Sequence, residues 1–264
     1  MILNAYITEW QKYAPWKDRV QIEQDLILSR ALSDIFSVPE LQSQLAFRGG
    51  TALNKLHLPK PARYSEDIDF VQVNAGGVGA IIDSMRAVLD PWLGTPKRKF
   101  TAASAKLQYH FQSSGDVPAP LRLKIEINTR EHFSLFGFIK EPFSVESSWY
   151  SNKVKVMTYQ LPELLGTKMR ALFQRKKGRD LFDVWYLTTA TNVDCKKAFE
   201  AFTFYNRKHH RTISLDDFIN NLEEKRDDRE FRQDMMPLLA PDLEYDFETA
   251  HRHVVSLIEK FYTA

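Results

Sequence analysis

The stretch LAFRGGTALNKLHLPKPARYSEDIDFVQV, residues 45–73, decides the fold. Its short apolar start, Leu45–Phe47, stops at Gly49-Gly50-Thr51, and residues 52–58 then have helical spacing. Residues 66–73 alternate between polar and apolar side chains, as a strand does. The stretch therefore predicts a strand, a glycine turn, a helix and a second strand.

The glycine turn is a candidate phosphate site. Gly49 and Gly50 allow a ligand to approach the backbone closely, and the helix that follows presents free N–H groups to an anion. A nucleoside triphosphate would suit this position. A tight strand-to-helix connection without a ligand is the alternative when the turn is taken alone.

Two acids on the following strand point in one direction. Ser65, Asp67 and Asp69 share a face because side chains alternate along a strand. Two carboxylates about 5 Å apart repel by roughly 3 kcal/mol at an effective dielectric of about 20, so a buried pair needs a neutralising partner. A divalent cation is such a partner, and the alternative is an edge strand whose acids meet solvent or Arg63.

More strands are expected before the chain becomes helical. Residues 105–112 and 121–128 are predicted to pair as a hairpin, and residues 153–157 to form another strand. Glu126 lies on the polar face of the second of these. If its strand lies beside the Asp67 strand, Glu126 completes three carboxylates for Mg²⁺, and otherwise it belongs to an ordinary polar face.

Helices are expected on both sides of the strands and between them. Periodicity predicts one helix before the first strand, one more within the sheet region and five after residue 160. Ser214 and Asp217 resemble a capping box. The expected helices are residues 18–36, 80–93, 161–173, 179–187, 196–205, 215–225 and 246–261. The predicted class is α+β, with a mixed-sheet domain at 1–160 and a helical-bundle domain at 161–264.

The segment GTKMRALFQRKKGRDLFDVWYL, residues 166–187, combines basic and acidic side chains. Lys168 falls inside an apolar helical stripe, from which it either reaches water or points into a cleft toward a phosphate. Arg175 and Arg179 form a local cationic patch. Asp180 and Asp183, three residues apart, could orient these cations, bind metal or act as a base. A solvated helix with local ion pairs is the alternative.

These segments together resemble a known family. The order is a glycine turn, a DxD strand about 17 residues later, a lone strand carboxylate and a basic helix, as in the nucleotidyltransferase β superfamily. FRGGTALNKLHL, RYSEDIDF, KIEIN and KMRALFQRKKGRDLFDVWYL resemble, in that order, the motifs of the AbiEii/AbiGii nucleotidyltransferase-like toxins. The resemblance covers residues 45–187, and the helical tail also fits.

The resemblance implies a bilobed protein with the active cleft between a nucleotidyltransferase domain and a helical domain. It implies an NTP substrate, Mg²⁺ or Mn²⁺, and a toxin of a type IV-like toxin–antitoxin system linked to phage defence, with a cognate antitoxin encoded by an adjacent gene. MenT-type relatives add pyrimidine nucleotides to the acceptor end of tRNA. Position by position, it implies phosphate or nucleotide contacts from Gly49, Gly50, Thr51, Ser65, Arg175 and Arg179, metal ligands at Asp67, Asp69 and Glu126, and catalytic roles for Asp67, Asp69, Lys168, and Asp180 or Asp183.

Composition excludes several other classes of protein. The 264 residues carry 36 Lys and Arg against 34 Asp and Glu, so any basic surface must be local. Cys195 is the only cysteine, which excludes a disulfide framework and thiolate-rich zinc modules. The start lacks a signal-peptide core and no run of about 18 apolar residues occurs, so we expect a cytoplasmic protein without a membrane partner.

We expect a Mg²⁺-dependent nucleotidyltransferase toxin that transfers a nucleotide from an NTP to RNA, most simply to the 3′ end of tRNA, and so blocks translation. Two alternatives stay open at this point. One keeps the chemistry with a protein or small-molecule acceptor. The other is a nucleotide- or RNA-binding module without turnover, in which the acids only hold a nucleotide.

Overall fold

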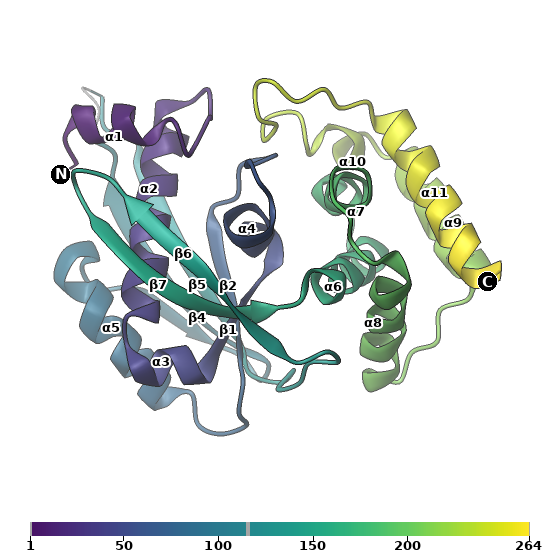
Figure 1. Ribbon diagram of the computed structural model, residues 1–264, viewed down its shortest axis with the longest axis horizontal. Helices are drawn as coiled ribbons and strands as arrows, with labels where there is room; N and C mark the ends of the chain where they lie inside the picture. The colour runs from purple at the N-terminus through teal and green to yellow at the C-terminus, as the bar shows by residue number, and fades with distance from the viewer. Residues whose placement is uncertain (1, 115–116, 264) are drawn as a thin grey trace. The chain divides into compact units, whose positions relative to one another are not determined.

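A computed structural model describes residues 2–114 and 117–263 of the chain (Figure 1). The chain divides into two compact units, Met1–Tyr159 and Gln160–Ala264, which we call the sheet unit and the helical unit. The expected α+β class, a mixed sheet followed by helices, is confirmed. The division falls one residue before the boundary that the sequence suggested.

The sheet unit is built on seven strands in the order β3-β4-β5-β2-β1-β7-β6. They are β1 (Leu45–Arg48), β2 (Asp67–Gln72), β3 (Lys97–Phe100), β4 (Ser104–Gln112), β5 (Pro120–Asn128), β6 (Phe138–Glu146) and β7 (Ser151–Tyr159). The predicted hairpin of β4 and β5 is confirmed, and it is antiparallel. The two edge strands, β3 and β6, were not predicted from the sequence.

Strand β2 occupies the centre of the sheet. It runs antiparallel to β1 and parallel to β5, which brings together segments more than 50 residues apart. In this register Asp67 lies beside Lys124, and Asp69 lies beside Glu126. Neighbouring residues of adjacent strands share a face of the sheet, so all four of these charged side chains are on one face.

The opposite face of the sheet carries the core of this unit. Helix α2 packs there, and its Phe36 ring lies 5.8 Å from that of Phe70, on β2. Tyr109, on β4, is on the same face and donates a hydrogen bond to Asp90 of α5. The helices of the sheet unit are α1 (Asn4–Trp10), α2 (Arg19–Phe36), α3 (Pro39–Gln44), α4 (Gly49–Ala52) and α5 (Gly79–Leu93), and a π-helical turn, η1 (Leu53–His57), continues α4.

The helical unit contains α6 (Leu161–Gln174), α7 (Gly178–Ala190), α8 (Cys195–Lys208), α9 (Leu215–Arg226), α10 (Arg229–Gln233) and α11 (Phe247–Thr263). The capping box predicted at Ser214 and Asp217 is confirmed at the start of α9. Gly166 lets α6 approach α8 closely, because a Cβ there would lie 2.5 Å from the carbonyl oxygen of Ala198. None of the helices in the described ranges has both the length and the apolar character required to cross a bilayer.

Candidate active site

The glycine turn places backbone directly against two charged side chains. Gly49 has φ +83°, a left-handed conformation that favours glycine. A Cβ on Gly49 would lie 2.7 Å from Oδ2 of Asp69, and a Cβ on Gly50 would overlap the Arg63 guanidinium. Both glycines are therefore required for the strand-to-helix turn to lie against Asp69 and Arg63.

Replacing Gly49 by Ala is expected to impair activity more than stability, because the new methyl group would displace the Asp69 carboxylate. Gly137 is a matched control, since its φ is +80° and a Cβ there would meet nothing within 4 Å. Both variants should lose about 1 kcal/mol of unfolding free energy through the left-handed conformation, measured by urea unfolding. Only Gly49→Ala should lose nucleotidyl transfer, and equal loss in both variants would contradict this.

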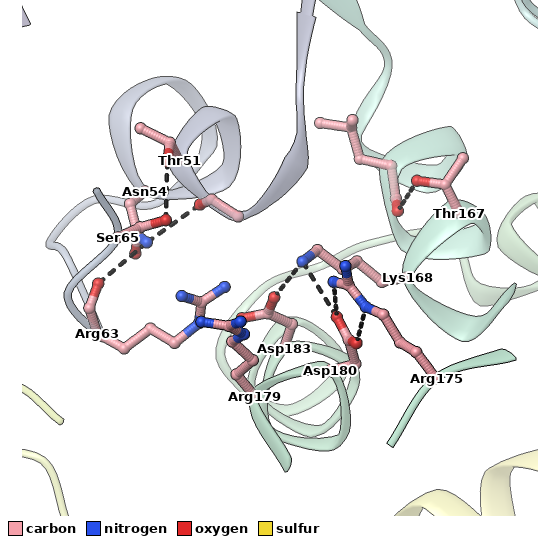
Figure 2. Close-up of polar contacts among 12 residues, drawn as sticks. Thr51, Asn54, Arg63, Ser65, Thr167, Lys168, Arg175, Arg179, Asp180 and Asp183 are labelled. Atoms are coloured by element: carbon pink, nitrogen blue, oxygen red, sulfur yellow. Dashed lines mark hydrogen bonds and ion pairs between the residues drawn. The ribbon is translucent and has the colours of Figure 1, made fainter. Parts of the chain in front are cut away.

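Hydroxyl and amide groups fasten the turn to the start of β2. The Thr51 hydroxyl lies 2.8 Å from that of Ser65 (Figure 2). It donates to the carbonyl oxygen of Asp67 at 2.5 Å. The Asn54 amide donates to the carbonyl oxygens of both Gly50 and Arg63 at 3.1 Å. Thr51, predicted as a phosphate contact, is thus buried and already bonded within the protein, where it fixes the turn relative to the acid-bearing strand.

The acid pair lies on the face of the sheet away from helix α2. Asp67 accepts a 2.7 Å hydrogen bond from Nζ of Lys124, through Oδ2. Its other oxygen, Oδ1, is buried without a hydrogen-bond partner. A buried anionic oxygen without a partner is costly, so this atom is poised to accept a cation or a donor.

Burial raises the pKa of Asp69 above its ordinary value, and the neighbouring charge of Asp67 raises it further. The charges of Lys124 and Arg48 act in the opposite direction but do not cancel this effect. Burial alone would lower the pKa of Lys124, yet its contacts with Asp67, Asp69 and Glu126 raise it. Lys124 thus lies among three carboxylates.

Glu126 shares the face of Asp69 but is engaged by lysines. Its carboxylate lies 2.9 Å from Nζ of Lys106 and 3.8 Å from Nζ of Lys124. Across residues 2–114 and 117–263, no group of three or more Asp, Glu, His or Cys side chains is arranged as a metal site. Asp67 and Asp69 therefore form a two-carboxylate site, and the role of Glu126 as a third ligand stays a prediction.

Two arginines beside the turn were not recognised as site residues from the sequence. Arg63 is 3% exposed and donates to the carbonyl oxygen of Tyr64 at 3.1 Å. Arg48 is the register neighbour of Asp69 and forms a 2.6 Å ion pair with the buried Glu131. Arg48 directly precedes Gly49-Gly50, and Arg63 lies two residues before Ser65-Glu66-Asp67, so their closeness to these motifs in the sequence could have identified them. Lys124, two residues before Glu126, could have been identified in the same way.

The predicted residues of the helical unit also gather, around a buried lysine. Lys168, on α6, has a side chain only 8% exposed and forms a 2.6 Å ion pair with Asp183 and a 3.4 Å pair with Asp180, both on α7 (Figure 2). The side chain of Asp180 is fully buried. Of the two outcomes left open by the sequence, reaching water is excluded for Lys168.

The two arginines have separate partners. Arg175 ends α6 in an extended conformation, so α6 and α7 are not one continuous helix, and it holds both oxygens of Asp180 at 2.5 and 2.8 Å. Arg179 lies on α7 and contacts Asp234 through its backbone N–H at 3.0 Å and its guanidinium at 4.0 Å. Both arginine side chains stay about half exposed, at 52% and 40%.

Burial alone would raise the pKa of Asp180, but the charges of Lys168 and Arg175 outweigh this effect and hold it below the ordinary value. Asp180 is thus a stable anion, which favours a role in orienting cations over a role as a general base. In the sheet unit, by contrast, the pKa of Asp69 is raised and Oδ1 of Asp67 has no partner, and perturbed groups of this kind cluster at functional sites.

Comparisons with known proteins match the chain to one family. The family model described as "Nucleotidyl transferase AbiEii toxin, Type IV TA system" matches residues 30–253. No curated protein matches the chain.

Solved structures share the fold at low sequence identity. MenT4, a nucleotidyltransferase toxin of Mycobacterium tuberculosis H37Rv, is 14% identical, with a TM-score of 0.64 over 98% of this chain and 90% of that one. A proposed nucleotidyltransferase of H. pylori is 17% identical, with a TM-score of 0.51 over 93% and 96%. The fold is therefore that of a nucleotidyltransferase. The chain belongs to the AbiEii family of nucleotidyl transferase toxins of type IV toxin–antitoxin systems, and it is a nucleotidyltransferase.

Proposed function

We propose that this toxin transfers a nucleotide from an NTP to a hydroxyl group of RNA, at the 3′ acceptor end of tRNA, and that the transfer depends on Mg²⁺ or Mn²⁺. The observation that carries the proposal is the pair Asp67 and Asp69, held on one strand directly under the Gly49 turn. A nucleotidyltransferase needs such a pair to bring a polyphosphate and its counter-ion to one place.

The acid pair fits a divalent cation. Oδ1 of Asp67 is buried without a partner, and the pKa of Asp69 is raised first by burial and then by repulsion from Asp67, a repulsion that a cation would relieve. Oxygen ligands of this kind suit Mg²⁺, which keeps water and substrate phosphates as its other ligands. The ion would neutralise charge on the phosphates and polarise the attacking hydroxyl group. Glu126 is proposed as a further ligand once Lys106 and Lys124 release it.

The groups of the chain have separate tasks in the transfer. The acceptor hydroxyl oxygen forms a bond to the α-phosphorus while the bond from that phosphorus to the bridging oxygen breaks, and pyrophosphate leaves. The hydroxyl proton passes to a carboxylate of the acid pair. Gly49 and Gly50 hold the phosphates through the backbone, and Thr51 and Ser65 fix that turn.

We assign the helical-unit residues to phosphate binding and its support. Arg175 and Arg179 are the exposed cations of the group and are proposed to contact substrate phosphates. Lys168 is proposed to act beside them, with Asp180 and Asp183 setting its position. The cognate antitoxin that the family implies is proposed to be encoded by an adjacent gene. The toxin itself is proposed to act in the cytoplasm, as part of a phage-defence system.

A labelling reaction tests this function. Purified toxin is incubated with each α-³²P-labelled NTP, Mg²⁺ and total RNA, and we expect label in a tRNA-sized band that disappears with EDTA. Periodate oxidation of the RNA removes its 3′-terminal hydroxyls and should prevent labelling. Label in protein but not in RNA would show that the acceptor is a protein and not RNA. NTP binding without pyrophosphate release would refute the enzymatic proposal.

A further inference from the structure

The face of the sheet that carries the acid pair continues as a basic surface to the edge of the sheet. The strand register aligns two rows of side chains across β2, β5, β4 and β3, because neighbouring residues share a face. These rows are Asp67–Lys124–Gln108–Lys97 and Asp69–Glu126–Lys106–Lys99. Each row therefore begins at an acid of the site and ends at a lysine of the edge strand.

The rows have the reach of a short stretch of nucleic acid. Neighbouring strands lie about 4.8 Å apart, so three spacings place the backbone of Lys99 about 14 Å from that of Asp69. Lys97 and Lys99 are exposed, and the Lys106 side chain is 30% exposed. Helices α2 and α5 pack on the other face of the sheet, where Phe70 and Tyr109 lie.

Positive charge is concentrated in this part of the chain. Residues 94–130 contain seven Lys and Arg and two Asp and Glu, a net charge of +5, whereas the whole chain has only +2. The rest of the chain is therefore net negative, at −3. Some of the cations are partly neutralised, since Lys106 and Lys124 contact Glu126 and Arg122 lies 3.7 Å from Glu66. Neither Lys97 nor Lys99 forms an ion pair with the described residues.

Two occupants could match a positive surface: a nucleic-acid backbone or an acidic protein. Apart from the acids Asp67, Asp69 and Glu126 at and beside the site, the two rows contain four lysines and a glutamine, and no aromatic or large apolar side chain. Protein interfaces are depleted of lysine at their cores and enriched in aromatic residues and arginine. Lysine-rich surfaces are typical of phosphate contacts, which fix position without reading base sequence. The composition of the rows therefore favours nucleic acid.

We propose that Lys97, Lys99 and Lys106 form a docking surface for the phosphate backbone of the RNA acceptor, and guide its 3′ end to Asp67 and Asp69. This inference rests on the proposed function and adds the surface that the acceptor uses. Because only phosphates are contacted, the surface accepts many sequences, so the choice among RNA molecules is made elsewhere.

Lysines on an edge strand have another known use, which the test must separate from RNA binding. Charged residues on an edge strand prevent it from pairing with another sheet. Arg98 and Lys99 are equally able to prevent such pairing. The register neighbour of Arg98 is Leu107, however, which places Arg98 on the opposite face of the sheet. Lys99→Glu and Arg98→Glu thus change the charge equally, at adjacent positions of one exposed strand, on different faces.

The experiment measures transfer to RNA and to a short acceptor for wild type, Lys97→Glu, Lys99→Glu and Arg98→Glu. The two lysine variants should raise KM for tRNA about tenfold, with kcat and transfer to a trinucleotide acceptor unchanged, whereas Arg98→Glu should resemble wild type. With Lys→Gln variants, the slope of log affinity against log salt should become shallower by roughly one for each lysine removed. A KM for tRNA that is equal in Lys99→Glu and Arg98→Glu would overturn the proposal.

Two further outcomes keep this proposal distinct from the proposed function. If wild type labels no RNA, the proposed function fails first, and binding of fluorescent tRNA to the Asp67→Asn protein then tests the surface without chemistry. Weaker binding of tRNA by Lys99→Glu in that background would still support the surface. If the lysine variants instead bind tRNA normally but escape neutralisation by the antitoxin, the surface binds an acidic protein and the RNA assignment is wrong.

Discussion

Asp67→Asn should lower the rate of nucleotidyl transfer by about 10³-fold or more and abolish toxicity, and Asp69→Asn should do the same. The amide keeps the shape of the side chain but removes the charge, so a cation and a triphosphate are no longer held together. The unpartnered Oδ1 of Asp67 and the raised pKa of Asp69 both show that the folded protein accommodates these charges at a cost. Such a cost at a site is expected where it serves function.

The measurement is single-turnover transfer from an α-labelled NTP at saturating Mg²⁺, with growth arrest on expression as a second readout. Glu66→Gln is the matched control, because Glu66 precedes β2 and has a side chain 50% exposed that pairs only loosely with Arg122. That variant should keep transfer within a fewfold of wild type. If Asp67→Asn and Asp69→Asn transferred nucleotide within tenfold of wild type, the acid pair would not be the catalytic centre.

The acid face could be predicted from sequence because it depends only on local geometry. Alternation along one strand places Asp67 and Asp69 together whatever the strand's neighbours are. The partner of Asp67 depends on which strand lies beside it, and Lys124 reaches it only because β2 and β5 pair in parallel. The sequence contained Lys124 on the polar face of its strand, but no local pattern specifies that pairing across more than 50 residues.

The two missed strands show a different limit. Strand β3 reads KRKF, with all four residues exposed, so it has no apolar alternation to detect. Strand β6 contains Pro142, which lowers any strand prediction. Both lie at edges of the sheet, where one side of the strand needs no partner and charged residues or proline are tolerated. For the same reason, the sequence did not predict the basic surface that is proposed to bind RNA.

In the helical unit the spacing identified an unusual residue but not its surroundings. Lys168 stands out because it interrupts an apolar stripe, and that position correctly indicates a buried helix face. Its partners depend on how α6 and α7 fold back on each other through Arg175, Lys176 and Lys177. Gly178, the first residue of α7, lets that helix start directly against α10, because a Cβ there would overlap the carbonyl oxygen of Phe231. This is tertiary information that periodicity does not contain.

Lys168→Met should destabilise the helical unit by about 3–5 kcal/mol, the usual cost of removing one member of a buried ion pair. The substitution keeps the length of the side chain but leaves Asp183 and Asp180 without the ammonium group that contacts both. Against a typical total of roughly 5–15 kcal/mol for a domain, the loss is large. Urea unfolding gives its size, and hydrogen–deuterium exchange of α6 and α7 peptides locates it.

Lys176→Met is the matched control in the same unit, because Lys176 pairs with Asp228 at the surface with a side chain 53% exposed. It should change unfolding and exchange little. In the double variant Lys168→Met/Asp183→Asn, removal of the second charge should restore part of the stability. This recovery would show that the loss comes from removing the positive charge beside Asp183 and not from the shape of the new side chain.

The same network sets a pH dependence whose sign follows from Asp180. Its pKa in the folded protein lies below the ordinary value of 3.8, so it stabilises the fold above that pH, and the contribution is lost as pH falls through the folded pKa. Wild type should therefore keep protection of α6 and α7 down to about pH 4. Without the lysine the pKa of Asp180 rises, so Lys168→Met should lose further stability at a higher pH than wild type does.

A different result would contradict the structural role of Lys168. If the unfolding free energy of Lys168→Met stayed within about 1 kcal/mol of wild type but the variant lost NTP affinity, Lys168 would be a phosphate ligand first and a structural residue second.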